Sequence, residues 1–262
     1  SAGYKAPLHI MLSNGGLGST TTAGDFPIRL IESGPVAGAI VGRQLAELMN
    51  IRNVLSFDMG GTTAKICLIA DGEPERARVF EVARAYRNLK GSGWPVRIPV
   101  IEMVEIGAGG GSIARVDAMQ RITVGPDSAG SEPGPACYGR GGTNATVTDA
   151  NLSLGRLNAT QFAGGRFTLD PAQADAAVSE AVGKPLGLSD AWAAAGISEI
   201  VEENMANAAR VHAIERGRII DRHVMIAFGG AAPLHATRLA TKLGIRRVVV
   251  PKGAGVGSAI GF

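Results

Sequence analysis

The sequence predicts an α/β fold in which helices pack on a mostly parallel or mixed sheet. Residues 223–251 have the pattern of a strand, "HVMIAF", then a loop and helix, "GGAAPLHATRLATKLG", and then a strand, "IRRVVVP". Strands that alternate with helices favour a sheet covered by helices. The chain is 45% hydrophobic and 19% charged, which is typical of a soluble globular protein with a substantial core. Its 262 residues suffice for one large or two small domains.

The N-terminal elements are predicted from turn residues and helical spacing. "APLHIMLSNGG" predicts a strand that ends in a turn at residues 14–16, and "FPIRLIESGP" predicts a second strand. Pro35 then stands where a first helical turn would begin, and "VAGAIVGRQLAELMN" continues with apolar residues at helical spacing. Small residues make one face of this helix thin, which favours close packing against a sheet.

The later elements follow in order. "NVLSFDMGGTTAKICLIA" predicts a strand, a tight loop and a strand, and residues 79–104 predict further strands with irregular connections. Residues 107–142, rich in glycine and proline, predict long ordered loops with short strands. Helices are predicted over residues 171–182 and about 189–217, where Asn and Gly are possible breaks. The final "GAGVGSAIGF" has the pattern of a helix start.

The charge distribution argues against a nucleic-acid surface. The formal net charge is +3 and the pI about 9.1, but the charges do not cluster. The densest basic run, residues 76–90, is interrupted by Glu81 and predicts an exposed strand or sheet edge. Aromatic residues make up only 5% of the chain, too few for a base-stacking surface. We therefore expect no nucleic-acid partner.

Cysteine usage and hydropathy indicate the compartment. Cys67 and Cys137 make neither a disulfide framework nor a zinc site. No apolar run approaches the roughly 18 residues that span a bilayer, and no signal peptide opens the chain. We expect a cytoplasmic protein without a membrane partner.

The stretch "DMGGTT", residues 58–63, has the composition of a phosphate-binding hairpin. A tight turn exposes backbone N–H groups, Gly60 and Gly61 let a phosphate approach them, and the hydroxyls of Thr62 and Thr63 add donors. Asp58 at the strand end could hold a magnesium ion, usually through water, or orient a nucleophile. The chain lacks both G-x-x-x-x-G-K-[ST] and a strand-following G-x-G-x-x-G. An ordinary polar turn is the alternative.

A second candidate is "AFGGAAPLHA", in which Gly229, Gly230 and Ala231 lead from a predicted strand into a predicted helix. This arrangement suits a flat ring lying against bare backbone, and the helix N-terminus favours negative charge nearby. His235 lies one turn inside the helix. It could face the site, or it could simply cap or pack.

The third candidate is glycine-rich and comprises residues 105–117 and 124–150. Ordering segments this rich in glycine costs much chain entropy, so a substrate or interdomain site would have to offset that cost. A flexible loop is the alternative, but isolated apolar anchors argue against it. The candidate substrate-side residues here are Gly109, Gly110, Gly111 and Ser112.

Together these blocks resemble the hydantoinase A / 5-oxoprolinase family of the actin–hexokinase–Hsp70 ATPase superfamily. The resemblance runs from about Leu8 to Phe262. It implies the central catalytic region of a longer protein, because family members carry an N-terminal region with its own "DxGGT" loop and a further C-terminal region. The matching blocks, in family order, are "SNGG", "ESGPVAGAIVG", "SFDMGGTTAK", "GAGGGSIARVD", "VGPDSAGSEPGPACYGRGGT", "TVTDANLSLGRL" and "GGAAPLHA".

The resemblance implies an actin-like, ribonuclease H-like ATPase fold, with a mixed sheet, flanking helices and a glycine-rich inserted strand and loop region. Residues 28–70 and 190–262 would form the nucleotide-binding core, and residues 71–189 the inserted substrate-side region. The implied cofactors are ATP and Mg²⁺. Asp58 would be the catalytic and metal-binding residue, residues 58–63 the second phosphate loop, and Gly229–Gly230 the adenosine motif.

The resemblance also implies an activity. Relatives couple ATP hydrolysis to opening cyclic amides such as 5-oxoproline or hydantoins, through phosphorylation of a carbonyl or enolate oxygen, and commonly work with a companion hydantoinase B-type subunit. Other relatives carboxylate ketones, and the motifs here do not separate the two activities. A nucleotide-gated scaffold or chaperone-like module is a third alternative, against which the glycine-rich block argues. Without the other phosphate loop, the isolated chain is expected to bind nucleotide weakly.

Three further side chains are substrate-side candidates by resemblance. Cys137 and Tyr138 would line or support the substrate region, although Cys137 could equally be a packing residue. Lys65 stands in "DMGGTTAK" where many relatives have an acid in "DMGGTSTD". A lysine there could neutralise phosphate charge or steer an anionic substrate, or it could point into solvent.

Overall fold

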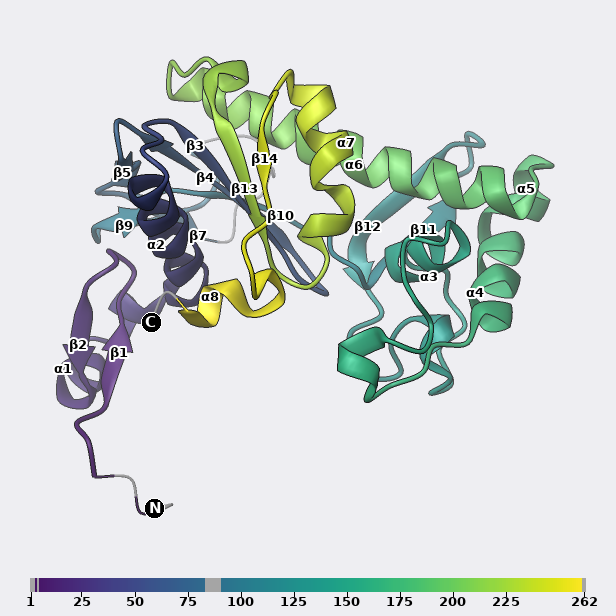
Figure 1. Ribbon diagram of the computed structural model, residues 1–262, viewed down its shortest axis with the longest axis horizontal. Coiled ribbons are helices and arrows are strands. Elements are labelled where there is room, and N and C mark those ends of the chain that lie inside the picture. The colour runs from purple at the N-terminus through teal and green to yellow at the C-terminus, as the bar shows by residue number, and fades with distance from the viewer. Residues whose placement is uncertain (1–2, 4, 83–90, 261–262) are drawn as a thin grey trace. The chain divides into compact units, whose positions relative to one another are not determined.

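The computed structural model describes residues 3, 5–82 and 91–260 (Figure 1). These residues form two compact units. The first unit comprises the described residues within the ranges 1–56, 67–103 and 256–262, and the second comprises residues 57–66 and 104–255. Strands β3 (Val54–Met59) and β4 (Ala64–Ala70) enter both units, and the short hairpin that joins them belongs to the second.

The central sheet has six strands in the part of the chain that is described, and it is mixed, as predicted. Its order is β10, β4, β3, β13, β14, with β5 paired to β4. Strand β10 runs antiparallel to β4, whereas β13 and β14 are parallel. Strands β3, β4 and β13 are almost wholly buried, which explains their near-continuous apolar sequences. The remaining bounds are β5 (Glu73–Pro74), β10 (Val104–Ile106), β13 (Val224–Phe228) and β14 (Val248–Val249).

The main helix of the first unit, α2 (Ser33–Leu48), confirms the predicted helix around Pro35 and its thin face. A Cβ placed on Gly42 would lie 3.2 Å from the Cβ of Ser56, so glycine lets the helix approach the sheet closely. Only β6 and β7 of the basic run 76–90 can be described, since residues 83–90 lie outside the described residues. The other elements are β1 (His9–Met11) paired with β2 (Leu17–Ser19), α1 (Thr20–Asp25), β6 (Arg76–Ala77) with β9 (Val100–Ile101), β7 (Phe80–Val82) with β8 (Trp94–Val96), and α8 (Gly257–Ile260).

The strand predicted for "FPIRLIESGP" is wrong, because Pro27–Leu30 forms a short 3₁₀ helix. Pro27 fixes the backbone φ at the first helical position and removes a donor that a strand would need. The hydroxyl of Ser13 lies within hydrogen-bonding reach of the carbonyl oxygens of Arg29 and Ile31. The backbone N–H of Ser13 also donates to the carbonyl oxygen of Arg29 at 2.8 Å, so the Ser13 hydroxyl proton is free to donate to that of Ile31.

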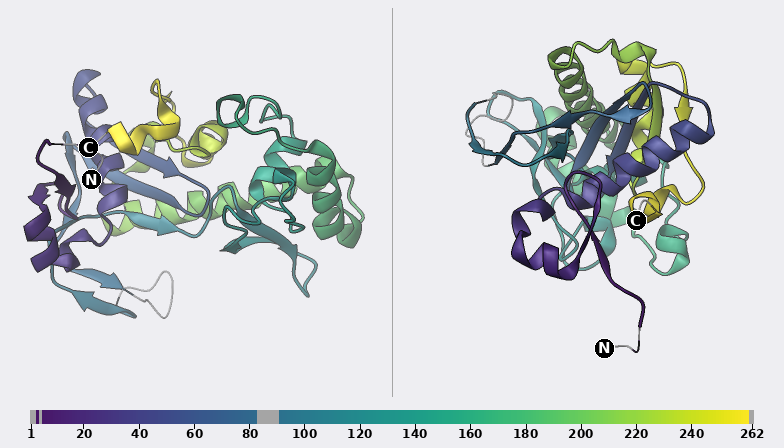
Figure 2. Two further views of the ribbon diagram at one scale, coloured as in Figure 1. Left: turned by 90° about the horizontal axis from the view of Figure 1, so that it is seen from below. Right: turned by 90° about the vertical axis from the view of Figure 1, so that its left-hand side faces the viewer.

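In the second unit, the long helix α6 (Asp190–Glu215) packs along the hairpin formed by β11 (Ser112–Val116) and β12 (Ile122–Ser128) (Figure 2). Gly196 does not break the helix. A Cβ at this position would lie 2.6 Å from the side chain of Ile122, so glycine admits the hairpin closely. The other helices are α4 (Pro171–Val178), which continues through a π turn (Ser179–Gly183) into α5 (Lys184–Leu186), and α7 (Ala232–Leu243).

Helix α3 (Val147–Ser153) is not predicted by the sequence analysis above. It begins with a capping box in which Thr146 accepts from the backbone N–H of Asp149 and Asp149 accepts from that of Thr146. The T-x-x-D pattern in "TVTD" is therefore the signal that would have located it.

Candidate active site

The candidate site is built on Asp58–Thr63, called the phosphate hairpin from here on. Phe57 and Met59 of β3 are fully buried, and Asp58 between them points to the opposite side of the strand, where it is only partly buried. The turn is closed by a hydrogen bond of 3.1 Å from the N–H of Gly60 to the carbonyl oxygen of Thr63. The predicted strand, tight loop and strand are thus confirmed.

The first glycine-rich segment contacts this hairpin directly. The N–H of Gly110 donates to the carbonyl oxygen of Gly60 at 3.0 Å, and that of Gly111 donates to Gly61 at 2.6 Å. A Cβ on Gly109 would lie 2.6 Å from backbone atoms of Gly61 and Thr62. Glycine is therefore required here because the two backbones touch. Ser112 is buried beside them and accepts from the N–H of Gly109 at 2.8 Å.

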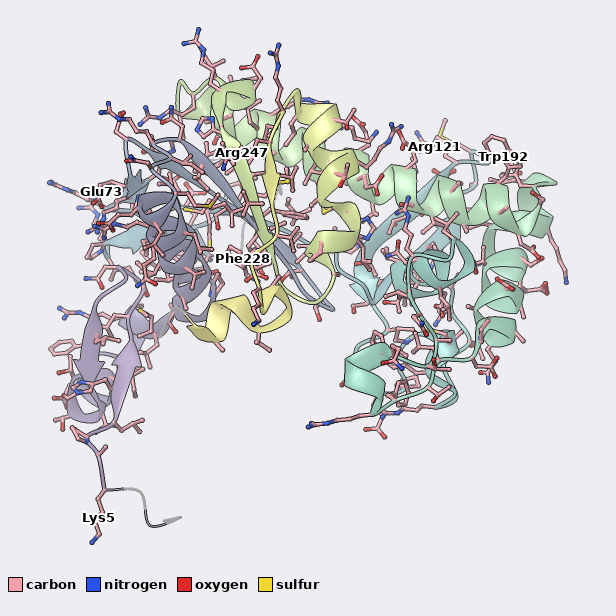
Figure 3. The ribbon with its side chains drawn as sticks, viewed as in Figure 1. Lys5, Glu73, Arg121, Trp192, Phe228 and Arg247 are labelled. Carbon is pink, nitrogen blue, oxygen red and sulfur yellow. The ribbon has the colours of Figure 1, made fainter. Side chains whose placement is uncertain are left out.

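The segment that follows β13 meets the hairpin at its other end. Phe228, labelled in Figure 3, is buried, and the chain then turns at Gly229, whose φ is +91°. A Cβ there would lie 2.4 Å from a carboxylate oxygen of Asp58. The N–H of Ala231 donates to the carbonyl oxygen of Met59 at 2.9 Å. Helix α7 starts at Ala232. The space beside Gly230 is open, because a Cβ there would meet nothing within 4 Å.

The charge of Asp58 is set by burial and by Lys65. Burial raises the pKa of Asp58, and the positive charge of Lys65 partly opposes that rise. The Lys65 ammonium donates to the Thr63 hydroxyl oxygen at 2.6 Å and lies 3.1 Å from a carboxylate oxygen of Glu105 on β10. Only 21% of the Lys65 side chain is exposed. Lys65 of β4 therefore contacts the phosphate hairpin through Thr63 and does not extend into solvent.

The donor set fits a magnesium ion held mainly by a nucleotide. Among the described residues, no cluster of three or more His, Cys, Asp or Glu side chains could hold a metal. Asp58 offers one carboxylate at the start of a turn that also contains two glycines and two threonines. Magnesium in phosphate-binding sites commonly takes one or two carboxylates and completes its shell with phosphate oxygens and water. The pair of Asp58 and a bound phosphate would satisfy that requirement.

Cys137 and Tyr138 lie in a separate hydrophobic cluster. Cys137 is fully buried against Leu152, Leu169 and Ala174, and burial strongly raises the pKa of its thiol. The ring of Tyr138 packs at 5.2 Å edge-on against Phe167. The Cys137 side chain is therefore a packing side chain, the alternative that the sequence left open.

His235 is also buried and does not face the phosphate hairpin. Its Nδ1 lies 3.0 Å from a carboxylate oxygen of Glu202 on α6, and its Nε2 lies 3.0 Å from the amide nitrogen of Asn151 on α3. Arg156 and Ser198 also contact Glu202. Sequence reasoning missed Glu202, Asn151 and Arg156. A charged residue on the apolar face of α6 is the only signal that could have found Glu202.

Comparison with known proteins gives the family. The sequence profile described as hydantoinase/oxoprolinase matches residues 1–262. The alpha subunit of caprolactamase from Pseudomonas jessenii is 38% identical over 96% of this chain and 35% of its own length. The acetophenone carboxylase gamma subunit of Aromatoleum aromaticum is 38% identical over 96% of this chain and 33% of its own length.

Comparison with solved structures finds the same kinds of protein. A nucleotide-free structure of acetone carboxylase matches with a TM-score of 0.86 at 31% identity, over 99% of this chain and 35% of that one. The ATP-dependent caprolactamase of Pseudomonas jessenii matches with a TM-score of 0.80 at 35% identity, over 98% and 36%. This chain thus spans about a third of the length of these relatives. Among the described residues, none of the helices has both the length and the apolar composition of a membrane-spanning segment. Since the profile covers the whole chain, the chain belongs to the hydantoinase/oxoprolinase family.

Proposed function

We propose that the chain carries the nucleotide-binding side of an ATP-dependent enzyme that opens a cyclic amide such as a hydantoin or 5-oxoproline. The γ-phosphoryl group of ATP passes to the carbonyl oxygen of the amide, and ADP leaves. Water then adds to the carbon that bears the phosphorylated oxygen, the ring C–N bond breaks, and the nitrogen takes a proton from that water, which leaves an acyl phosphate and an amine. A second water hydrolyses that acyl phosphate and releases inorganic phosphate.

One observation carries this proposal: three glycine-rich segments, distant in sequence, meet around Asp58. Gly109–Gly111 and Gly229–Ala231 both contact the backbone of the phosphate hairpin. Phosphoryl transfer depends on positioning and charge neutralisation more than on a covalent nucleophile. Bare backbone, hydroxyl groups and one carboxylate are the groups that this chemistry uses.

Each group of the site has a role in the proposal. The N–H groups of Gly61, Thr62 and Thr63 and the two threonine hydroxyls bind phosphate oxygens. Gly60 has no Cβ and leaves room for the phosphate, since its own N–H closes the turn. Asp58 holds Mg²⁺ through its carboxylate or through water, and the ion neutralises phosphate charge. Lys65 orients the Thr63 hydroxyl: because its ammonium donates to that oxygen, the hydroxyl proton is left to donate to phosphate. Gly229, Gly230 and Ala231 receive the adenosine.

The substrate side and the partner extend the proposal. Residues 71–189 would supply the substrate-binding region, with residues 28–70 and 190–262 as the nucleotide core. Support comes from Gly109–Gly111, which lie in that inserted range and touch the phosphate hairpin. The caprolactamase and acetophenone carboxylase relatives are named as subunits, which supports a companion subunit. Its B-type identity is implied by the family resemblance alone.

An ATP-dependent ketone carboxylase is the second candidate. It is favoured by the match to acetone carboxylase, with its TM-score of 0.86. In that reaction the same site would phosphorylate an oxygen of the enolate or of bicarbonate. Bicarbonate dependence separates the two candidates.

The test is phosphate release from ATP by the full-length protein with its companion subunit. Cyclic amides, and ketones with and without bicarbonate, are tested in parallel for wild type and Asp58→Asn. We expect release that a cyclic amide stimulates and that the variant loses. Stimulation only by ketone with bicarbonate would establish the carboxylase. If no compound stimulates release, a nucleotide-gated scaffold becomes the better explanation.

A further inference from the structure

A buried polar network lies behind the candidate site, within the second unit. It consists of Asn151, Arg156, Ser198, Glu202 and His235, called the positioning network below. His235, Glu202, Asn151 and Ser198 are each at most 2% exposed. Burying a carboxylate and an imidazole is costly unless each finds partners, so this network must be nearly complete to be tolerated.

The hydrogen bonds of the network assign its protons. The Arg156 guanidinium can only donate, and its Nη1 lies 3.2 Å from the Oδ1 of Asn151, which must accept. The Asn151 amide nitrogen therefore faces His235 and donates to its Nε2 at 3.0 Å. The remaining ring nitrogen, Nδ1, then carries the hydrogen and donates to Glu202 at 3.0 Å. Arg156 and Ser198 also donate to the same Glu202 oxygen.

This network completes a closed series of contacts that runs from the phosphate hairpin through α3 and α7 and back to the hairpin. On one side, Gly110 contacts the hairpin and is itself held by Thr148 of α3, whose N–H and hydroxyl both donate to its carbonyl oxygen. On the other side, Ala231 contacts Met59 immediately before α7 begins. The bond between Asn151 of α3 and His235 of α7 joins the two sides.

We infer that the positioning network sets the spacing between the phosphate-side segment Gly109–Gly111 and the adenosine-side segment Gly229–Ala231. This inference rests on the proposed function, because it assumes that ATP binds to Gly229–Ala231 and to the phosphate hairpin, which Gly109–Gly111 hold in place. His235 is a positioning residue that touches neither nucleotide nor substrate. Glu202 fixes the ring of His235 from α6, and the Asn151–His235 bond transmits the position of α3 to α7.

Two conservative variants separate this role from simple packing. The amide of His235→Gln reaches the place of Nε2 and can still accept from Asn151, so it keeps the link between α3 and α7. The shorter amide of His235→Asn stands in for Nδ1, so it still donates to Glu202 but breaks that link. Each variant loses one hydrogen bond, but only His235→Asn breaks the contact between α3 and α7. Val178→Ala, a fully buried change on α4, controls for general loss of stability.

The experiment measures the Kd of Mg-ATP by equilibrium dialysis and the rate of phosphate release at saturating ATP, in the full-length protein with its companion subunit. We expect His235→Asn to raise the Kd at least tenfold while the rate at saturation changes less than threefold. His235→Gln and Val178→Ala should stay within threefold of wild type in Kd. If His235→Asn fails to fold, Asn151→Ser breaks the same link and is expected to give the same rise.

Four outcomes would overturn the inference. Unchanged Kd in His235→Asn would mean that the network only packs the core, and so would an equal rise in both His235 variants. A similar rise in Val178→Ala would trace the effect to general instability. If wild type itself fails to bind Mg-ATP, the proposed function falls and the inference with it. If wild type binds and the variants match it, only the positioning role is lost.

Discussion

Gly109 has no side chain because the backbone of the phosphate hairpin occupies the space that a Cβ would fill. That Cβ would meet atoms of Gly61 and Thr62 at 2.6 Å, and backbone atoms cannot rotate away. We expect Gly109→Ala to destabilise the full-length protein by about 1–3 kcal/mol, the usual cost of overpacking. It should also weaken Mg-ATP binding, because the hairpin must shift. Urea unfolding and equilibrium dialysis measure the two effects.

The matched control for this prediction is Gly34→Ala on α2. A Cβ on Gly34 would meet nothing within 4 Å, and its φ is not positive. Alanine in a helix is favoured over glycine by up to about 1 kcal/mol, so this variant should be equally or more stable than wild type. If Gly109→Ala behaved like Gly34→Ala, the close contact of the two segments would be refuted.

Asp58 should reduce the stability of the protein while it serves the reaction. Its pKa is raised in the folded state, mainly by burial, so the folded protein holds the proton more tightly than the unfolded chain. Stability therefore falls as pH rises from the unfolded pKa to the folded pKa, and the loss persists above both. Asp58→Asn removes this charge. We expect a higher melting temperature than wild type at neutral pH, together with a loss of activity of about 100-fold or more.

Thermal unfolding between about pH 4 and pH 8 tests whether the Asp58 carboxylate lowers stability as pH rises. The difference in melting temperature between Asp58→Asn and wild type should increase as pH rises and disappear at the acidic end of the range. Asp127→Asn, which changes a carboxylate that is 63% exposed, is the surface control. A variant less stable than wild type at neutral pH would show that the Asp58 carboxylate is well compensated by its surroundings.

Residue roles were the part of the site that sequence predicted least well. The sequence placed Asp58 at a strand end and the glycines in a tight turn, and the structure has both features. It left Lys65, Cys137 and His235 open, since each role depends on which neighbour the fold supplies. Those neighbours, Glu105, Leu169 and Glu202, come from distant segments.

At the scale of elements, helix α3 depends on one buried carboxylate. Asp149 accepts from the N–H of Cys137 at 2.8 Å, from the N–H of Thr146 at 2.9 Å and from the Thr146 hydroxyl at 2.7 Å. Asp149→Ala leaves these buried donors without a partner. We expect a loss of about 3 kcal/mol or more of the free energy of unfolding, since each unsatisfied group costs about 1–3 kcal/mol.

Asp170→Ala is the matched comparison for Asp149→Ala. Asp170 caps α4 through the N–H groups of Ala172 and Gln173, but these bonds are exposed. Loss of an exposed N-cap costs about 1 kcal/mol. Urea unfolding of both variants in the full-length protein tests the difference. Equal losses would mean that water replaces the Asp149 bonds and that α3 does not hold Gly110 through a rigid cap.

The sequence predicted the elements that have a clear period and missed those fixed by side-chain caps. Strands β3, β4 and β13 and helices α2, α6 and α7 follow from apolar runs or helical spacing. Pro27–Leu30 and α3 do not, because Ser13 and Asp149 decide their conformation through hydrogen bonds to the backbone. Residue propensities contain no information about either bond, because each joins residues more than ten positions apart.

At the scale of the whole molecule, the caprolactamase and acetophenone carboxylase relatives are each about three times as long as this chain. The described site offers Asp58, one hairpin and the segments that touch it. Transferring a phosphoryl group requires donors and cations around all the phosphate oxygens. The family resemblance implies a further "DxGGT" loop in the longer proteins, so the 262-residue chain would hold ATP from one side only.

We therefore expect the isolated chain to bind Mg-ATP about 100-fold more weakly than the full-length protein, a difference of roughly 2.7 kcal/mol. Its substrate-stimulated phosphate release should be negligible. Equilibrium dialysis of both forms measures the affinity, and circular dichroism checks that the isolated chain is folded. Adding the remaining segment of the full-length protein in trans should restore binding in part. Equal affinities would mean that the phosphate hairpin and its two glycine-rich neighbours form a complete nucleotide site, and the second loop would then serve the substrate instead.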